Sequence, residues 1–575
     1  MSGSDNRSSS LLFPVGRADG RPFVVGEPRH ETAEGLVERY RGEALAEFLA
    51  SEALEACGDY VLVDPEGADT RLVTSPGYAG GYVYEPEAGD GRGSGEPLVA
   101  TELGDLLAEL PDGFPGFDEA VLERYVGEEN RGFTHLPLAT VFDGIGRLPP
   151  ASHVELARDG VATFRTYLSG RRRPGTFGEA IETAVEHYRD DDVALMFSGG
   201  VDSVALYLAL RATQRNGSCR LVTVETGPGQ NNVEGARATA GALGTSLEVY
   251  DYGWPFRDEV VLEGIEECLG RDLVDPFDPH YAISLELDGV DAVLSGHNFD
   301  SLATVDMRRP PIPRHWDLLL RRDVTHTVME VVRNAQFSDA YVHSQGLRRL
   351  YGRVVPALVD GDLEPDPSTE GTLLGLLSTS KPNLVRPEDA WLAEEVRAYR
   401  DYAGRHPERV LLDMLNYHWH MHYWNKVYRT APAGTPGVDL PSNWGPLLSY
   451  YLGKHRGLEA AVGPKRDIYG YVHDRTGRSH FDLKFGSFRS SPRQLADLRR
   501  FRQGLRSRLL ERNRERLSPD ESTVLARVES GPLATRLDRL YGEIRGMIGG
   551  ELPYDDLKHG HRLLNLELLL DRVGE

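Results

Sequence analysis

Cysteine is scarce in this chain of 575 residues. Cys57, Cys219 and Cys268 stand far apart, and no Cys-x-x-Cys pair occurs. This spacing excludes a disulfide framework and a four-cysteine zinc or iron–sulfur site, and it is typical of a reducing compartment. Residues 1–10 are polar and lack the apolar core of a signal peptide, and no apolar run is long enough to span a bilayer. We therefore expect a cytoplasmic protein.

Lysine is scarce as well. The chain has 64 Lys+Arg against 89 Asp+Glu, which gives a net charge of −25, an argument against a large nucleic-acid-binding surface. An acidic surface poor in lysine suits a high-salt cytoplasm, although a GC-rich genome produces the same bias. Where arginine generally replaces lysine, a retained lysine is more often one that needs the compact ammonium or its tunable pKa. The retained lysines are Lys381, Lys426, Lys454, Lys465, Lys484 and Lys558.

The most informative motif is Ser198-Gly-Gly-Val-Asp-Ser203, which follows an apolar run at 193–197 and precedes an apolar helical pattern. Gly199 and Gly200 let the backbone approach a ligand closely. The first N–H groups of the helix form an anion site that suits phosphates. Asp202 would repel a bare phosphate, so its presence predicts a bridging Mg²⁺. The motif is not a Walker A loop, because no Gly-Lys-Ser/Thr follows.

The pattern of elements changes at a linker over 169–174. Before it, strands are expected at 58–64, 71–75 and 81–84, a hairpin at 153–156 and 162–167, and helices at 34–56 and 118–126, an α+β pattern. After it, strands at 193–197, 220–225, 246–251 and 291–295 alternate with helices at 176–188, 203–211 and 233–243. Alternation predicts a doubly wound parallel sheet whose ligand site lies at the carboxyl ends of its strands. Beyond about residue 320 the chain reads as a helical extension, so we predict two domains, 1–170 and 171–575.

Several motifs in this order resemble the asparagine synthetase family. The 198–203 loop resembles the pyrophosphate-binding loop of the ATP pyrophosphatase superfamily, and Ser295-Gly-His-Asn-Phe-Asp-Ser301 stands where the family has Ser-Gly-Glu-Gly-x-Asp-Glu. The stretches 58–64, 100–103 and 142–150 resemble the class II glutamine amidotransferase domain, an Ntn-like antiparallel sandwich, and 563–568 resembles the closing helix. The resemblance is thin between about 310 and 440.

This resemblance implies an ATP-dependent carbon–nitrogen ligase that adenylates a carboxylate, releases pyrophosphate and joins the acyl group to an amine. Residue by residue, it implies that phosphates bind at Ser198, Gly199, Gly200, Asp202 and Ser203. It implies nucleotide contacts from Ser295 and Gly296, Mg²⁺ held by Asp202 and Asp300, and an adenine pocket walled by the 221–225 strand. Lys465, or as a second choice Lys454, would neutralise the charge that develops between the carboxylate and the α-phosphate.

Two departures from the family pattern are equally informative. The family's glutaminases use an N-terminal cysteine, but here Ser2 follows Met1 in a polar tail, so we predict an N-domain without glutaminase activity. β-Lactam synthetases and their relatives in the family also lack that cysteine and take the amine from the substrate. The second departure is His297, which stands in place of the catalytic glutamate. A histidine there acts as a general base near neutral pH, or it indicates different chemistry.

Other interpretations stay open at this point. The Gly-His-Asn-x-Asp loop also resembles that of tRNA-modifying relatives, although their paired cysteines and basic surface are missing. A degenerate binding or scaffold homologue would fit His297 and Ser301. The histidines of His418-Trp-His-Met-His422 are interpreted as packing rather than as metal ligands, because alternate residues share a face only on a strand. The arginine-rich stretch 493–516 is interpreted as a solvated helix face. The expected partners are therefore a small carboxylate and an amine, without membrane or nucleic acid.

Overall fold

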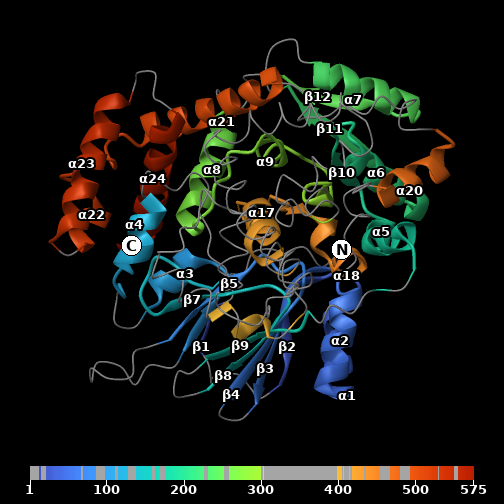
Figure 1. Cartoon of the computed structure of the whole chain (residues 1–575), viewed down its shortest axis with the longest axis horizontal. Helices are drawn as coiled ribbons and strands as arrows, with labels where there is room; N and C mark the ends of the chain where they lie inside the picture. The colour runs from blue at the N-terminus through green and yellow to red at the C-terminus, as the bar shows by residue number, and fades with distance from the viewer. Residues whose placement is uncertain are drawn as a thin grey trace, which may run out of the picture.

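The structure is a computed structural model of the chain. It describes residues 12–14, 21–66, 69–85, 97–110, 114–126, 138–157, 162–168, 173, 175–225, 231–251, 258–299, 302, 398–399, 401–404, 406, 414, 417–432, 435–452, 466–478, 492–528, 530–548 and 554–574. Figure 1 shows a β-sandwich on one side of the molecule and a parallel sheet with helices on the other. Both parts of the predicted fold class are confirmed.

The N-terminal half is built from two antiparallel sheets. Their strand orders are β1 (Leu12–Pro14), β6 (Leu98–Ala100), β5 (Gly81–Tyr84), β7 (Ile145–Leu148) in one, and β2 (Phe23–Pro28), β3 (Gly58–Glu66), β4 (Asp69–Thr74), β8 (Ser152–Leu156), β9 (Ala162–Thr166) in the other. Alternate residues on the facing strands form a shared core, for example Val61 and Leu72 from one sheet and Val83 and Val99 from the other. The predicted antiparallel sandwich is confirmed.

Local details of this half differ from the predictions. The helix expected over 34–56 is two helices, α1 (Ala33–Gly42) and α2 (Leu45–Glu55), and Gly42 ends the first of them. Glycine is a poor helix former, and Thr32 caps α1 by accepting a hydrogen bond from the Gly35 N–H. The stretch 142–150, where no strand was expected, contains β7, which pairs with β5. Two further helices, α3 (Leu103–Ala108) and α4 (Glu119–Val126), complete the described part of this half.

The second half contains the predicted parallel sheet. Its order is β12 (Leu247–Tyr250), β11 (Cys219–Val224), β10 (Val193–Met196), β13 (Ala292–Ser295), β14 (Val438–Asp439), and every pair is parallel. The chain moves from β10 outward through β11 and β12, and then returns to the other side of β10 as β13. The loops after β10 and β13 therefore diverge at a topological switch point, where ligands bind in open α/β sheets.

Helices precede or connect these strands along the chain. They are α5 (Phe177–Val185), α6 (Val201–Thr213), α7 (Asn231–Ala242), α8 (Glu259–Arg271) and α9 (Pro279–Ser284), and a short 3₁₀ turn η1 (Glu186–Tyr188) follows α5. A reciprocal capping box between Thr176 and Glu179 starts α5. Helices α5, α6 and α20 (Arg466–Thr476) pack together beside the sheet, whereas α7 and α9 contact β11.

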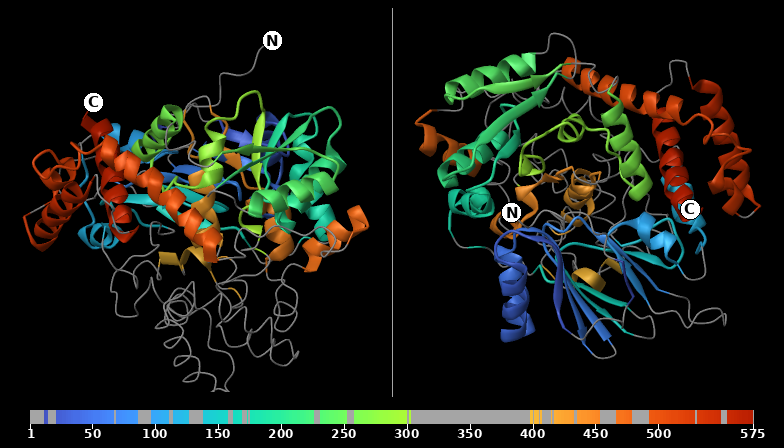
Figure 2. Two further views of the ribbon diagram at one scale, coloured as in Figure 1. Left: turned by 90° about the horizontal axis from the view of Figure 1, so that it is seen from above. Right: turned by 180° about the vertical axis from the view of Figure 1, so that it is seen from behind.

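The described C-terminal residues are almost entirely helical, as predicted. They form η3, a π-turn (Tyr417–Met421), α17 (His422–Arg429), η4 (Pro441–Asn443), α18 (Gly445–Tyr451), α21 (Pro492–Arg512), α22 (Thr523–Arg527), α23 (Pro532–Met547) and α24 (Tyr554–Gly574). Helix α24 packs against α8, α21 and α3, so it ties the C-terminus to both halves of the molecule (Figure 2). Across the described ranges, we find no helix with the length and apolar character that crossing a bilayer requires.

The arginines of α21 correct one prediction. Arg506 is 2% exposed and donates to both carboxylate oxygens of Asp275 at 2.9 Å, and Arg502 donates to Asp278 at 2.9 Å. Farther along, Arg512 pairs with Glu263 at 3.1 Å. The interpretation of this stretch as a solvated face is wrong for Arg502 and Arg506, because the acidic segment before α9 draws them inward.

Candidate functional site

The loop after β10 has the shape of a phosphate cradle. Gly199 has φ +70°, a left-handed conformation that glycine adopts without strain, and a Cβ there would lie 2.8 Å from the Ala236 Cα on α7. Gly200 is the N-cap of α6 and offers no side chain to cap the helix. The first N–H groups of α6 therefore face the loop at the positive end of the helix dipole.

Hydroxyl groups hold this loop in its conformation. Ser198 Oγ accepts a hydrogen bond from the Gly200 N–H at 3.3 Å, and Ser203 Oγ donates to the Gly200 carbonyl at 3.0 Å. The two hydroxyl oxygens lie 3.4 Å apart. Asp202 lies in the first turn of α6 and is partly exposed. The loop thus combines hydroxyls, helix N–H groups and one carboxylate within six residues.

The loop after β13 approaches the same place. A Cβ on Gly296 would lie 3.2 Å from the Ser203 backbone nitrogen, so the two loops touch at the start of α6. Ser295 is buried, and its Oγ accepts a hydrogen bond from the His297 N–H at 3.2 Å. The structure therefore brings the 198–203 loop together with Ser295 and Gly296. Asp300, Lys465 and Lys454 lie outside the described residues.

His297 is held on several sides. Its ring centroid lies 4.7 Å from that of Trp424 and 5.5 Å from that of Tyr428, both on α17. Its carbonyl accepts a hydrogen bond from Ser442 Oγ at 2.9 Å. The next residue, Asn298, has φ +68° and donates from its side chain to the Met421 carbonyl at 3.1 Å. This oriented imidazole lies one residue after the glycine that touches α6.

Asp278 provides a buried negative charge near this imidazole. It caps α9 by accepting from the His280 N–H at 3.0 Å, and it also accepts from the Tyr428 hydroxyl at 2.7 Å and from Arg502 at 2.9 Å. Burial raises the pKa of Asp278, but the positive charges of Arg502, His280 and His297 outweigh it and lower the pKa to about 2. The carboxylate is therefore ionised at neutral pH. Sequence reasoning missed Asp278, for which Asp-Pro at a helix start was the only local signal.

These residues fit a magnesium-bound triphosphate. Gly199 and Gly296 let their loops pack closely against α7 and the start of α6, and the hydroxyl and N–H groups of the first loop suit phosphate oxygens. The Asp202 carboxylate is an oxygen ligand of the type that Mg²⁺ prefers. The role of β11 as a wall of an adenine pocket stays a prediction.

His418 and His422 are packed in the interior of the molecule. His418 lies 2.9 Å through Nδ1 from the Met414 carbonyl and 2.8 Å through Nε2 from the Tyr402 hydroxyl. His422 is buried and packs against Gly80 of the sandwich. A Cβ on Gly80 would lie 2.9 Å from the His422 Nε2.

Burial of His418 predicts a loss of stability in acid. Burial lowers its pKa to about 4, so the unfolded state binds more protons as the pH falls from about 6.5 toward 4. Stability is expected to fall in that window by at most about 3 kcal/mol from this residue. Urea midpoints measured across the window should fall less steeply in His418→Gln than in the wild type. Equal slopes in the two proteins would contradict this assignment.

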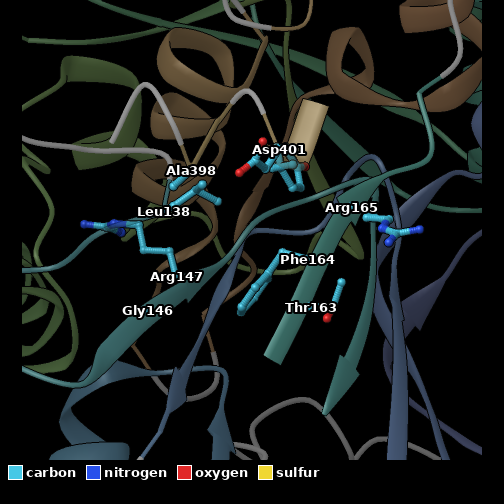
Figure 3. A pocket seen from close by; sticks show the side chains of 9 residues that line it. Leu138, Gly146, Arg147, Thr163, Phe164, Arg165, Ala398 and Asp401 are labelled. Carbon is cyan, nitrogen blue, oxygen red and sulfur yellow. The ribbon is translucent and has the colours of Figure 1, made fainter. Parts of the chain in front are cut away.

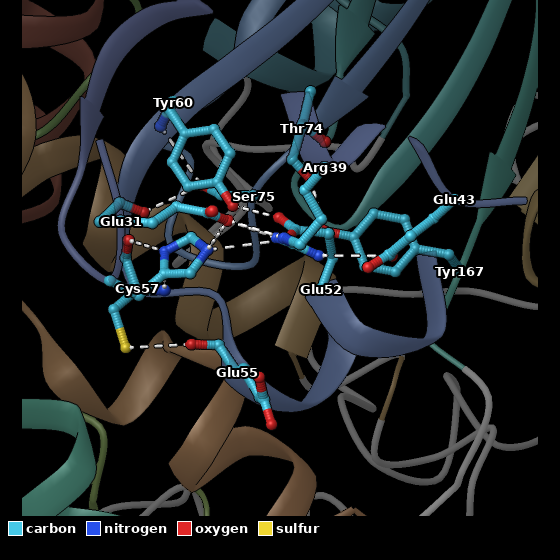
Figure 4. A network of polar contacts seen from close by, with 12 residues as sticks. Glu31, Arg39, Glu43, Glu52, Glu55, Cys57, Tyr60, Thr74, Ser75 and Tyr167 are labelled. Atoms are coloured by element: carbon cyan, nitrogen blue, oxygen red, sulfur yellow. Dashed lines mark hydrogen bonds and ion pairs between the residues drawn. The ribbon is translucent and has the colours of Figure 1, made fainter. Parts of the chain in front are cut away.

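One cluster in the sandwich has the composition of a metal site. Among the described residues, His30, Glu31 and Glu52 form the single group of potential metal ligands within 4.8 Å of one another. Figure 4 shows that the Arg39 guanidinium lies between the two carboxylates, and the Tyr60 hydroxyl donates to Glu52. Burial alone would lower the pKa of His30, but the hydrogen bond and the negative charge of Glu52 outweigh burial and raise this pKa. Arg39 supplies the cation here, so we interpret the cluster as an ion-pair network.

A cavity of about 410 Å³ opens at the edge of the sandwich (Figure 3). Strands β7 and β9 and the segment around 398–402 form its walls, and Leu138 and Phe164 make part of them apolar. None of the residues expected from the sequence to bind nucleotide lines this cavity. Its lining residues do not include any from the loops after β10 and β13.

Comparison with known families supports the assignment of the second half. Residues 176–413 match the family model described as asparagine synthase. The match begins at the N-cap of α5 and includes both loops at the switch point. No curated protein matches the chain significantly.

Proposed function

We propose that the chain is a carbon–nitrogen ligase that forms AMP, on the premise that residues 176–413 match the model of the asparagine synthase family, a family of ATP-dependent ligases. A carboxylate oxygen of the substrate attacks the α-phosphorus of ATP, and pyrophosphate leaves. An amine, either ammonia or a group within the substrate, then attacks the acyl carbon, and AMP leaves. The product is an amide or a lactam.

One observation carries this proposal. The loop after β10 meets the loop after β13 at the switch point of the sheet, with Gly296 packed against the Ser203 nitrogen. This placement supports binding of the β- and γ-phosphates at the start of α6, by N–H groups and by the hydroxyls of Ser198 and Ser203. Asp202 would hold Mg²⁺ together with Asp300. When bound, Mg²⁺ neutralises charge on the triphosphate.

His297 is proposed as the base that accepts a proton from the attacking amine. Its ring is oriented by Trp424 and Tyr428, which is the positioning that proton transfer requires. The ionised Asp278 lies close enough to interact with its charge and would stabilise the imidazolium. Lys465 is proposed to neutralise the charge that develops on the carboxylate side.

The remaining half is proposed to support this site without chemistry of its own. We assign residues 1–170 to an amidotransferase-like domain that lacks glutaminase activity, and residues 171–575 to the ligase. Because Ser2 replaces the nucleophilic cysteine, the nitrogen would come from free ammonia or from a substrate amine.

Product analysis tests the proposed chemistry. Wild-type protein is incubated with Mg·ATP, ammonium and pools of carboxylic acids, and the nucleotides and pyrophosphate formed are quantified. The proposal predicts AMP and pyrophosphate in equal amounts with the right pool. In His297→Gln, exchange of labelled pyrophosphate into ATP should persist, whereas amide formation should fall by about 10²-fold or more, because the base is missing. Formation of ADP and phosphate would contradict the proposal.

A further inference from the structure

Helix α17 lies between the sandwich and the parallel sheet, and the two sides of the helix contact different halves of the molecule (Figure 1). Residues at positions 422, 425, 426 and 429 share one side, since they are spaced three and four apart. Trp424 and Tyr428 are four apart and share another side. The first side contacts the sandwich, and the second side contacts His297.

The first side is fastened to the sandwich by buried polar contacts. Asn425 Nδ2 donates to the Gly77 carbonyl at 2.8 Å, and Lys426 Nζ donates to the carbonyls of Gly80 and Thr101 at 3.1 Å each. One turn on, Arg429 donates through Nε to Asp59 on β3 at 3.1 Å, and through a terminal nitrogen to Asp439 on β14 at 2.6 Å. Directional contacts of buried charged groups hold a helix in one rotational setting.

The second side of α17 contacts His297 and Asp278. Trp424 and Tyr428 both pack on the ring of His297, and the Tyr428 hydroxyl donates to Asp278 at 2.7 Å. Arg502 lies over Trp424 with 6.0 Å between the guanidinium carbon and the ring centroid. A rotation of α17 that released its sandwich contacts would move both aromatic rings away from His297.

We propose that Asn425, Lys426 and Arg429 are positioning residues, through which the sandwich fixes Trp424 and Tyr428 against His297. That this alignment matters for catalysis rests on the proposed function, whereas the contact of α17 with His297 can be tested without any enzymatic reaction. It gives the sandwich a role other than glutamine hydrolysis: the surface against which the base is aligned.

Tryptophan emission tests the proposal without knowledge of the substrate. The chain has six tryptophans, so the Trp424 signal is the emission lost on Trp424→Phe in each background. In the wild-type background, His297→Gln should change this signal, because it removes the imidazole ring that packs against the indole at 4.7 Å. In Asn425→Leu and in Arg429→Met, the response of the signal to His297→Gln should be lost. Asn425→Leu keeps the test decisive if Arg429→Met fails to fold.

Arg29→Met is the matched control. Arg29 lies 3.6 Å from Asp439 and stacks on Tyr188, so its removal weakens the same contact between the halves without touching α17. The response should persist in this variant. Calorimetric titration with Mg·ATP should give the same affinity in Asn425→Leu, Arg429→Met and Arg29→Met as in the wild type. If the wild type does not bind Mg·ATP, that result counts against the proposed ligase activity and not against the positioning role. A response retained in folded Asn425→Leu, or lost equally in Arg29→Met, would overturn the positioning role.

Discussion

Replacement of Lys426 by methionine is expected to destabilise the protein by about 3–5 kcal/mol, because it leaves a buried carboxylate without its cation. Lys426 Nζ lies 2.6 Å from Asp272 Oδ2, and the two side chains are 5% and 0% exposed. The ammonium also donates hydrogen bonds to the Gly80 and Thr101 carbonyls of the sandwich. Asp272 would keep a hydrogen bond from the Tyr82 hydroxyl, which does not replace a charge. Equilibrium unfolding in urea measures the loss.

Two controls accompany this measurement. The double variant Lys426→Met with Asp272→Leu removes both charges, and it should recover most of the lost stability. Arg539→Met breaks an exposed pair with Glu543 and should cost less than about 1 kcal/mol. A loss below about 1 kcal/mol in Lys426→Met would mean that Asp272 does not depend on the Lys426 ammonium for its charge to stay buried.

Replacement of Gly199 by alanine is expected to lower the affinity for Mg·ATP by about 10- to 100-fold, the cost of one lost hydrogen bond to a charged group. The new Cβ would meet the Ala236 Cα at 2.8 Å, so the loop must move away from α7 and turn its N–H groups off the phosphates. The left-handed conformation adds a stability cost of about 1–2 kcal/mol. Calorimetric titration and thermal unfolding measure the two effects.

Gly244 provides the matched control for this substitution. It has φ +73°, and a Cβ there would meet nothing within 4 Å. Gly244→Ala should therefore cost about 1–2 kcal/mol of stability through backbone strain alone and leave the affinity for Mg·ATP unchanged. If both variants bind Mg·ATP as the wild type does, the loop after β10 is not the phosphate site.

The parallel sheet and its phosphate loop could be predicted because their signals are local. Buried strands read as short apolar runs, and the glycines of the 198–203 loop mark where the backbone must turn sharply. Strand β14 escaped prediction because two residues carry no period, and its pairing is decided by β13, far away in the chain. The break between α1 and α2 was missed because the sequences of both helices have a helical composition.

The surroundings of His297 could not be predicted, because they come from distant segments. Asp278, Trp424, Tyr428 and Arg502 meet only after the sheet, α17 and α21 have packed. The scarcity of lysine was a usable signal that we applied to Lys465, which lies outside the described residues. The same signal applies to Lys426, where the compact ammonium fits among two carbonyls and one carboxylate.

The most direct test of the proposed nucleotide site is a calorimetric titration of the intact protein with Mg·ATP at high salt, with Asp202→Asn beside the wild type. It requires no knowledge of the carboxylate or the amine. The account predicts binding to the wild type that weakens markedly in Asp202→Asn, because the variant lacks the carboxylate that would hold the metal against the triphosphate. A folded wild-type protein that does not bind Mg·ATP would contradict the ligase assignment.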